Sequence, residues 1–431
     1  MVAERVFKGS RKEPCHRDSM DRQTDFIQGK NGKKVHNGNF FWKILQLILC
    51  FPALQKLRLL FYFYDCLVLW GVRKAKKRKT EKKQILFVFP LSLGDSILFL
   101  GSLPCIRRIW PAAEHRLSLT CHTEYAALFS GYFDEVIAVD YRRASVDPLY
   151  RARFCRSFRK RYFDLAVDPV GCEACSPNVF VMHAVSAGEK IGAISASDQK
   201  FQCPTWMQRR IYTKILCNTQ KNLHKVRYYA WFWSELGRRR CEPALARFSY
   251  PGRADLPARY VVIAASASTQ VKQWPAERFA EIARRIWRLT GHALVLCGTA
   301  RDRAVTERFL QELRDGAPYY DLVGQTSVTE LIGVIGKAEL VVTNDTGAYH
   351  IAVAQRRKVC VVTGGYVYDM FIDYGCRRYG CPEPAVVCPK WACANCGNHC
   401  VYRVKGIYPC VEHNTVEDVW SGVLRLLEDT E

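Results

Sequence analysis

The sequence lacks a long apolar run of the kind that crosses a membrane. Its most apolar stretch, Phe40–Trp70, is interrupted by charges, and its longest charge-free part runs only from Ile44 to Gln55. A spanning helix needs about 20 apolar residues. Residues 1–38 are polar and charged and contain no apolar core, so we expect no cleavable signal peptide.

Motifs for nucleic-acid recognition are also missing. The sequence has no zinc-finger spacing with paired histidines, no aromatic RNA-binding motif and no basic heptads. The net charge of +23 nevertheless keeps nucleic-acid binding by a basic tail open as a third hypothesis. We predict no nucleic-acid partner, because an anionic membrane or an anionic acceptor explains the charge at least as well.

The positive charge is unevenly distributed. Residues 1–83 hold 20 lysines and arginines against 7 acidic residues, which is +13 of the total. Residues 1–38 are typical of a disordered basic tail. The apolar stretch Phe40–Trp70 and the basic cluster Arg73–Lys83 follow it. This order favours a segment that lies in an anionic membrane interface, with packing on the folded body and a true span as alternatives.

The 20 cysteines are scattered along the chain. Cys105, Cys121, Cys297 and Cys360 stand in apolar patterns, where free thiols act as small hydrophobic side chains. This usage is typical of a reducing compartment, so we expect a cytoplasmic protein.

A cysteine-rich segment, residues 376–410, lies near the end of the chain. Within it, the Cys393-x-x-Cys396 pair could begin a zinc site, with Cys388 and Cys400 as weaker candidates. Buried or interacting thiols are the more favoured interpretation, and a regulatory disulfide is the third. The loose spacing from Cys400 to Cys410 argues against a compact second ligand pair.

From Gln84 onward, short apolar runs alternate with helical patterns. Runs typical of strands include ILFVFP, RLSLTC, EVIAVD and FDLAVDP in the first half, and RYVVIAAS, HALVLCG, ELVVTND and KVCVVTG in the second. This alternation predicts parallel, doubly wound α/β sheets. We place an N-terminal domain at 84–255 and a C-terminal domain at 256–431, with a ligand site between the carboxyl ends of their strands.

Three loops after strands carry residues suited to chemistry. In the first, Ser92, Gly94, Asp95 and Ser96 open a helix, either as simple capping residues or with Asp95 as a proton acceptor. No GxGxxG motif is present in this loop, so a dinucleotide fingerprint is not supported. In the second loop, Lys272 precedes a helix and could hold a phosphate or simply be solvated.

The third loop, TNDTGAYHIAVA, joins a strand to a helix at Asp345, Thr346 and Gly347. Asp345 or Thr346 could cap this helix, and Gly347 leaves backbone N–H groups uncovered, which suits an anion. Taken alone, His350 is more simply a core histidine.

Together the three loops resemble glycosyltransferase family 9, the ADP-heptose:lipopolysaccharide heptosyltransferases. The matching stretches are SLGDSILFLGSLPCIRRIWP, VKQWPAERFAEIARRI and DLVGQTSVTELIGVIGKAELVVTNDTGAYHIAVAQ, in the family's order, and the resemblance covers about Gln84 to Val419. It implies two Rossmann-like domains of the GT-B type facing each other across a cleft. The N-terminal domain would bind the acceptor and the C-terminal domain the nucleotide sugar.

The resemblance also implies roles for residues. Asp95 would be the general base of an inverting transfer, Lys272 would contact the donor diphosphate, and the donor site would comprise Asp345, Thr346, Gly347 and His350. No cofactor would be required, since lysine and helix N–H groups can stabilise the leaving diphosphate and no DxD-type metal loop is present there.

We therefore expect transfer of a heptose or related sugar, with ADP-heptose as the donor, to lipopolysaccharide core or another lipid-linked glycan. The protein would attach peripherally to the cytoplasmic face of the inner membrane through residues 40–83. The alternative is a catalytically silent GT-B-fold binding protein at the membrane.

Overall fold

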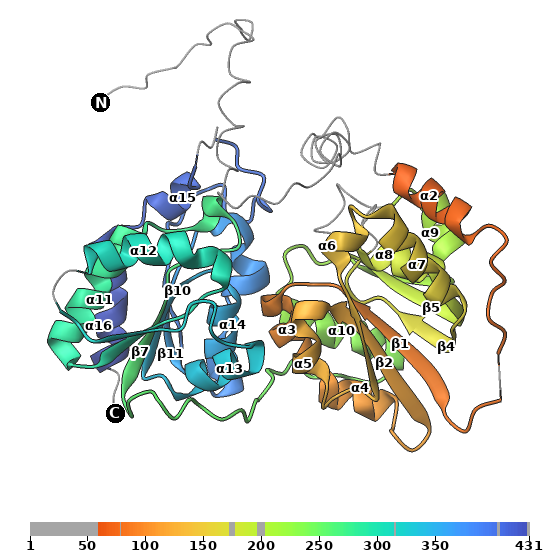
Figure 1. Ribbon diagram of the computed structural model, residues 1–431, viewed down its shortest axis with the longest axis horizontal. Coiled ribbons are helices and arrows are strands. Elements are labelled where there is room, and N and C mark those ends of the chain that lie inside the picture. Colours follow the sequence, from red (N-terminus) through yellow and green to blue (C-terminus); the bar gives the residue numbers. More distant parts are fainter. Residues whose placement is uncertain are drawn as a thin grey trace, which may run out of the picture.

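Two α/β units lie side by side in the computed structural model (Figure 1). The structure describes residues 59–77, 79–171, 177–195, 203–313, 316–402 and 406–428. The predicted basic tail and the part of the apolar stretch before residue 59 lie outside these residues.

The first sheet has six parallel strands in the order β3-β2-β1-β4-β5-β6. Its strands are β1 (Lys83–Phe89), β2 (His115–His122), β3 (Glu135–Val139), β4 (Tyr162–Val167), β5 (Ser186–Ser195) and β6 (Lys214–Asn218). The central strand β1 is buried from Ile85 to Phe89, as expected for a parallel strand covered on both faces.

Helices cover both faces of this sheet. They are α3 (Leu93–Leu100), α4 (Leu103–Ile109), η2 (Thr123–Tyr125), α5 (Ala126–Phe129), α6 (Tyr141–Ala144), α7 (Pro148–Arg159), α8 (Pro177–Ala184), α9 (Thr205–Ile211) and α10 (Lys225–Gly237). The residues around 200–258 contain α9, the edge strand β6 and α10.

The second sheet repeats this arrangement, in the order β12-β11-β10-β7-β8-β9. Its strands are β7 (Tyr260–Ala264), β8 (Ala293–Leu296), β9 (Tyr319–Asp321), β10 (Leu340–Asn344), β11 (Lys358–Val362) and β12 (Ala385–Val387). Its helical segments are η4 (Gln270–Lys272), α11 (Ala276–Thr290), η5 (Ala300–Asp302), α12 (Arg303–Glu312), α13 (Val328–Lys337), α14 (Gly347–Ala354), η6 (Gly365–Val367), η7 (Tyr368–Ile372), η8 (Cys376–Tyr379), α15 (Pro409–Glu412) and α16 (Val416–Glu428).

Both sheets therefore follow the 3-2-1-4-5-6 order of a doubly wound fold. The direction of winding reverses between β1 and β4 in the first sheet and between β7 and β10 in the second. Ligands of such folds bind at the carboxyl ends of the strands beside this reversal. The two units meet there, with α3 packed against α14.

The helix α2 (Leu59–Leu69) packs on the outside of the first unit against α7 and α8. Its buried Asp65 accepts two hydrogen bonds of 2.6 Å from Nε and Nη2 of Arg151 on α7. The described end of the apolar stretch thus packs on the body by one face. No helix in the described ranges has the length and apolar character that a bilayer crossing requires.

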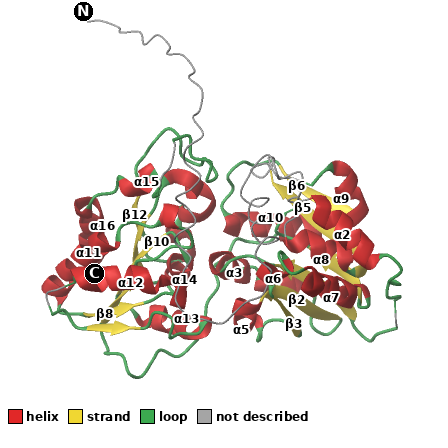
Figure 2. Cartoon of the chain, turned by 45° about the horizontal axis from the view of Figure 1, so that its top comes forward, coloured by secondary structure: helices red, strands yellow, loops and turns green. Residues whose placement is uncertain are grey.

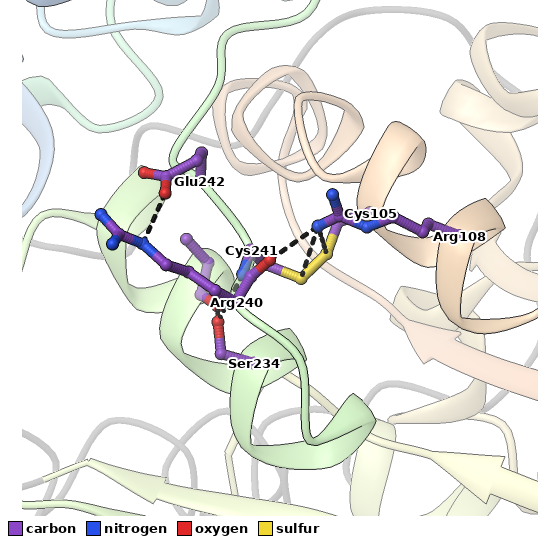
Figure 3. Close-up of a disulfide and its surroundings, with 7 residues drawn as sticks. Cys105, Arg108, Ser234, Arg240, Cys241 and Glu242 are labelled. Atoms are coloured by element: carbon purple, nitrogen blue, oxygen red, sulfur yellow. Dashed lines mark hydrogen bonds and ion pairs between the residues drawn. A yellow bond between two sulfur atoms is a disulfide. The ribbon is translucent and has the colours of Figure 1, made fainter.

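Cys105 departs from the expectation of a free thiol. It forms a disulfide with Cys241, with 5.9 Å between the two Cα atoms (Figure 3). The bond ties α4 to the segment that leaves α10, and Nη2 of Arg108 donates to the Arg240 carbonyl beside it at 2.7 Å. A pairing across so much sequence depends on tertiary placement, which no local pattern reveals.

Candidate active site

Loops at the winding reversals of both sheets bring the predicted residues together. Ser92, Gly94, Asp95 and Ser96 follow β1, Lys272 follows β7, and Asp345 to His350 follow β10. The three loops that the sequence singles out therefore lie at the carboxyl ends of strands beside the two reversals. Their meeting point is the contact between α3 and α14.

The first loop places Asp95 in the first turn of α3. The Ser92 hydroxyl donates to Oδ2 of Asp95 at 2.6 Å, and the Ser96 hydroxyl donates to the Ser92 carbonyl at 2.8 Å. Ser92 is the N-cap residue, but its side chain caps no backbone N–H. Ser92 therefore orients the carboxylate of the half-buried Asp95 through a neutral hydroxyl donor, and Ser96 stabilises the backbone turn.

Two glycines allow α3 and α14 to approach each other closely. A Cβ atom at Gly94 would lie 2.5 Å from Cδ2 and 3.0 Å from Nε2 of His350, which is closer than real contacts allow. Reciprocally, a Cβ atom at Gly347 would lie 2.9 Å from Cδ2 of Leu93. Each glycine thus makes room for a side chain of the other unit's loop.

His350 is the buried centre of this contact. Its Nδ1 lies 2.6 Å from the hydroxyl of Tyr374, and the residue is 4% exposed. Burial lowers the pKa of His350, the charges of Asp345 and Asp95 act to raise it, and Lys272 acts to lower it. Ionisable groups from all three loops therefore influence this one imidazole.

Lys272 and Asp345 come from neighbouring loops of the second unit. Nζ of Lys272 lies 3.9 Å from Oδ2 of Asp345 and 4.5 Å from the centre of the Tyr366 ring. Both side chains are largely buried, so their charges are poorly screened by water. A cation held in this way could stabilise a phosphate that approaches from the open side.

Asn344, the last residue of β10, fastens these two loops together. Its Oδ1 accepts from the Trp274 amide at 3.0 Å, and its Nδ2 donates to the Ala265 carbonyl at 2.8 Å. Thr346 then caps α14, with Oγ1 accepting from the Ala348 amide at 3.3 Å. The helix that carries His350 therefore begins at a fixed position relative to Lys272.

Three residues of the site are missed by the sequence analysis. Tyr366 lies under Lys272, and burial followed by the charge of Asp345 raises the pKa of its phenol. Tyr374 contacts His350, and the ring of His224 lies 4.5 Å from the ring of Tyr374. The stretch TGGYVYDMFIDYG could have pointed to the two tyrosines, because it follows β11 on the same edge of the sheet.

Asp168 is a fourth residue that was not predicted from the sequence. It lies directly after β4, beside the winding reversal of the first sheet. It is fully buried and accepts hydrogen bonds from the Tyr212 hydroxyl at 2.6 Å and the Asn178 side chain at 2.7 Å. Burial raises the pKa of Asp168 to about 6, and the bond from Tyr212 opposes this shift. The run FDLAVDP signals it, since an acid follows a buried strand just as Asp95 follows β1.

The cysteine-rich segment packs against the loops that follow β7 and β11 in the second unit. The backbone N–H of Asn395 donates to the Gly365 carbonyl at 2.6 Å, and the backbone N–H of Tyr408 donates to the Val271 carbonyl at 2.7 Å. A pocket between these loops is lined by Cys393, Cys396, Cys400 and Cys410. Across the described ranges, no three potential ligands are placed to hold a metal ion, so zinc binding, including by Cys388, stays a prediction.

Comparison with known proteins finds the same family resemblance over part of the chain. Residues 233–364, which contain the second and third loops, match the model described as Glycosyltransferase family 9 (heptosyltransferase). The resemblance drawn from the sequence motifs is confirmed.

Curated heptosyltransferases match over a shorter stretch. The chain is 34% identical over 95 residues to "Lipooligosaccharide heptosyltransferase 2" of Haemophilus influenzae, covering 22% of this chain and 27% of that protein. It is 30% identical over 95 residues to "Lipopolysaccharide heptosyltransferase 2" of Salmonella typhimurium, with the same coverage of 22% and 27%. The matched region thus spans about a quarter of these relatives' length.

Solved structures of family 9 share the fold over a larger part of the chain. The family 9 glycosyl transferase from Veillonella parvula aligns with 82% of this chain and all of its own, at a TM-score of 0.61 and 17% identity. The E. coli ADP-heptose lps heptosyltransferase II aligns with 80% of this chain and 98% of its own, at a TM-score of 0.55 and 16% identity. The predicted pair of Rossmann-like units is confirmed.

Proposed function

We propose that this protein is an inverting glycosyltransferase that moves a heptose or a related sugar from a nucleotide diphosphate to a lipid-linked glycan. The observation that carries the proposal is the contact of α3, whose first turn carries Asp95, with His350 on α14, which follows the loop where Asp345 lies beside Lys272. Inverting transfer requires a base on the acceptor side and a stabilised anion on the donor side. The two units supply one of these each.

The proposed reaction is a single displacement. The acceptor hydroxyl attacks the anomeric carbon and gives its proton to Asp95, whose carboxylate is oriented by Ser92. A bond forms between the acceptor oxygen and the anomeric carbon. The bond from that carbon to the diphosphate oxygen breaks, and its electron pair leaves with the nucleoside diphosphate.

The departing diphosphate would be stabilised by Lys272 and by the first turn of α14. This turn offers backbone N–H groups and the positive end of the helix dipole, and Thr346 covers only one of those groups. We propose that the reaction needs no metal ion, because these groups can supply the required positive charge. Activity should then withstand a metal chelator, and its loss on chelation would contradict this part of the proposal.

We propose ADP-heptose as the donor. Support comes from the E. coli heptosyltransferase WaaC, whose structures with ADP and with ADP-2-deoxy-2-fluoro heptose align with 80% and 81% of this chain at a TM-score of 0.56 each. The acceptor proposal, lipopolysaccharide core or another lipid-linked glycan, is supported by the names of the curated relatives. Such an acceptor implies a reaction at the cytoplasmic face of a membrane, with the protein attached peripherally.

The experiment that tests this function has two steps. Calorimetry with ADP, ADP-heptose and other nucleotide sugars should show binding that prefers ADP-heptose. Mass spectrometry should then detect a heptose added to the lipid-linked acceptor. Binding without transfer to any acceptor would favour the alternative, a catalytically silent GT-B-fold binding protein, and absence of binding would overturn the donor assignment.

A further inference from the structure

The helix α2 is apolar on nearly all sides, although it lies at the surface. Its inward face buries Tyr62, Val68 and Leu69 against the first unit. A surface helix normally has a polar outer face, and a helix apolar all round is normally buried in protein or in a membrane. The outer face of α2 therefore requires an explanation.

That outer face is a continuous apolar stripe. Leu60, Phe63, Leu67 and Trp70 are 56%, 52%, 74% and 87% exposed. Their spacing of three and four residues places Leu60, Phe63 and Leu67 on one side of the helix, and Trp70 lies in the turn directly after it. We refer to these four residues as the α2 outer stripe.

A second helix, distant in the sequence, extends the stripe. The Trp206 ring of α9 stacks beside the Phe63 ring with 6.4 Å between centroids, and it meets the edge of the Tyr62 ring at 5.5 Å. Trp206 is itself 43% exposed. Both views of the fold show α2 and α9 close together at the outer end of the first unit (Figures 1 and 2).

The stripe is held rigidly on the body of the protein. Besides the Asp65–Arg151 pair, the Tyr64 hydroxyl donates to the Pro148 carbonyl at 2.6 Å. The Asp65–Arg151 pair is buried, so breaking it would leave an uncompensated charge. The stripe is therefore a fixed face of the first unit.

Positive charge borders this apolar face. Exposed basic residues follow α2 in the chain at Arg73, Lys74, Lys76 and Lys79, and α9 adds Arg209 and Arg210. The Arg210 guanidinium lies 5.9 Å from the centre of the Trp206 ring. Apolar and aromatic side chains beside a basic cluster are the composition of surfaces that bind anionic bilayers.

We propose that the α2 outer stripe and Trp206 insert into the interface of an anionic lipid bilayer, with the basic residues contacting lipid phosphates. A second copy of this chain would bring the same positive charges against each other, so charge complementarity favours the bilayer. The 11 residues of α2 span roughly 16 Å, too short to cross, so the helix lies along the surface. The first unit would thus sit at the membrane, where a lipid-linked acceptor is found.

The test is vesicle sedimentation of the full chain without substrates, so its outcome does not depend on the proposed transfer reaction. Wild-type protein should bind vesicles of phosphatidylglycerol and phosphatidylcholine and bind phosphatidylcholine alone far less. Leu67→Glu should weaken anionic-vesicle binding by about tenfold or more, because it removes buried apolar area and adds a like charge to the lipid. Equal binding by Leu67→Glu and the wild type would overturn the proposal.

A matched control is available on the second unit. Leu289 on α11 is 57% exposed, so Leu289→Glu makes the same change on an unrelated surface and should bind vesicles like the wild type. Light scattering of both variants and the wild type tests whether a second copy of this chain, instead of a bilayer, covers the stripe. Wild-type dimers that Leu67→Glu dissociates would show that the stripe joins two copies, which would also overturn the proposal.

Discussion

The α-carbon of Gly94 lies directly against the imidazole of His350. A methyl group there would lie 2.5 Å from Cδ2 of that ring, although the two residues belong to helices of different units. The first turn of α3, which carries Asp95, is therefore placed within reach of the second unit's loops by the absence of one side chain.

Gly94→Ala should separate α3 from α14 and reduce transfer strongly, by about 100-fold or more, because small displacements of reacting groups are costly. His350 cannot easily yield, since it is buried and bonded to Tyr374. Gly131→Ala is the matched control, because a Cβ atom there meets nothing within 4 Å. Steady-state kinetics that show equal kcat/KM for both variants would contradict the close-approach argument.

Lys272→Met should weaken donor binding. Loss of one charged hydrogen bond to phosphate corresponds to roughly a 10- to 100-fold rise in the KM for the nucleotide sugar. The exposed Lys214 of β6 offers a control, since Lys214→Met removes the same charge far from the second unit's loops. If the donor KM rises equally in both variants, the effect comes from the lower net positive charge of the protein and not from a contact between Lys272 and phosphate.

Tyr374→Phe should lower activity about five- to tenfold, because His350 loses the hydrogen bond that fixes its ring nitrogen. Tyr349→Phe removes a neighbouring buried hydroxyl that donates to the Ile372 carbonyl at 2.7 Å. This control should lose about 1–3 kcal/mol of stability yet keep the wild-type kcat/KM and pH profile. If the two variants lose activity alike, the contact between Tyr374 and His350 has no positioning role.

Stability should fall in acid partly through His224. Burial and the charge of His350 lower the pKa of His224 from 6.5 to about 3. Its contribution is fully present above pH 6.5, and it is lost progressively as the pH falls toward about 3, because only the unfolded chain takes up the proton there.

The variant His224→Asn isolates this effect. Nδ1 of His224 accepts from the Val226 amide at 3.3 Å as the cap of α10, and asparagine can also cap a helix. Urea unfolding from about pH 7.5 to about pH 5 should show a free energy of unfolding that falls less steeply in the variant, by up to about 1.4 kcal/mol per pH unit. Identical slopes would mean that His224 does not remain neutral in the fold.

Much of the fold could be predicted from the sequence, because its signals are local. The buried run ILFVFP became β1, and ELVVTND followed by TGAYHIAVAQ became β10 and α14. The short strands β9 and β12, of three residues each, escaped the pattern. The edge strand β6 also lies in a stretch whose apolar pattern is weak.

The candidate site was predictable only in part. Asp95, Lys272 and His350 each follow an apolar run that predicts a strand, so their places in loops or at helix starts could be predicted. Tyr374 contacts His350 from 24 residues away, and the His224 ring of the other unit lies 4.5 Å from the Tyr374 ring. The first contact depends on packing within the second unit and the second on how the two units pack together, so neither follows from local spacing.

The most direct test of the proposed function is the rate of heptose transfer by Asp95→Asn. Asparagine keeps the size of the side chain but cannot accept the acceptor's proton. With ADP-heptose and a lipid-linked acceptor, the wild type should transfer the sugar, and the variant should be slower by about 100- to 10,000-fold while binding ADP equally well. Wild-type rates in Asp95→Asn would contradict the account.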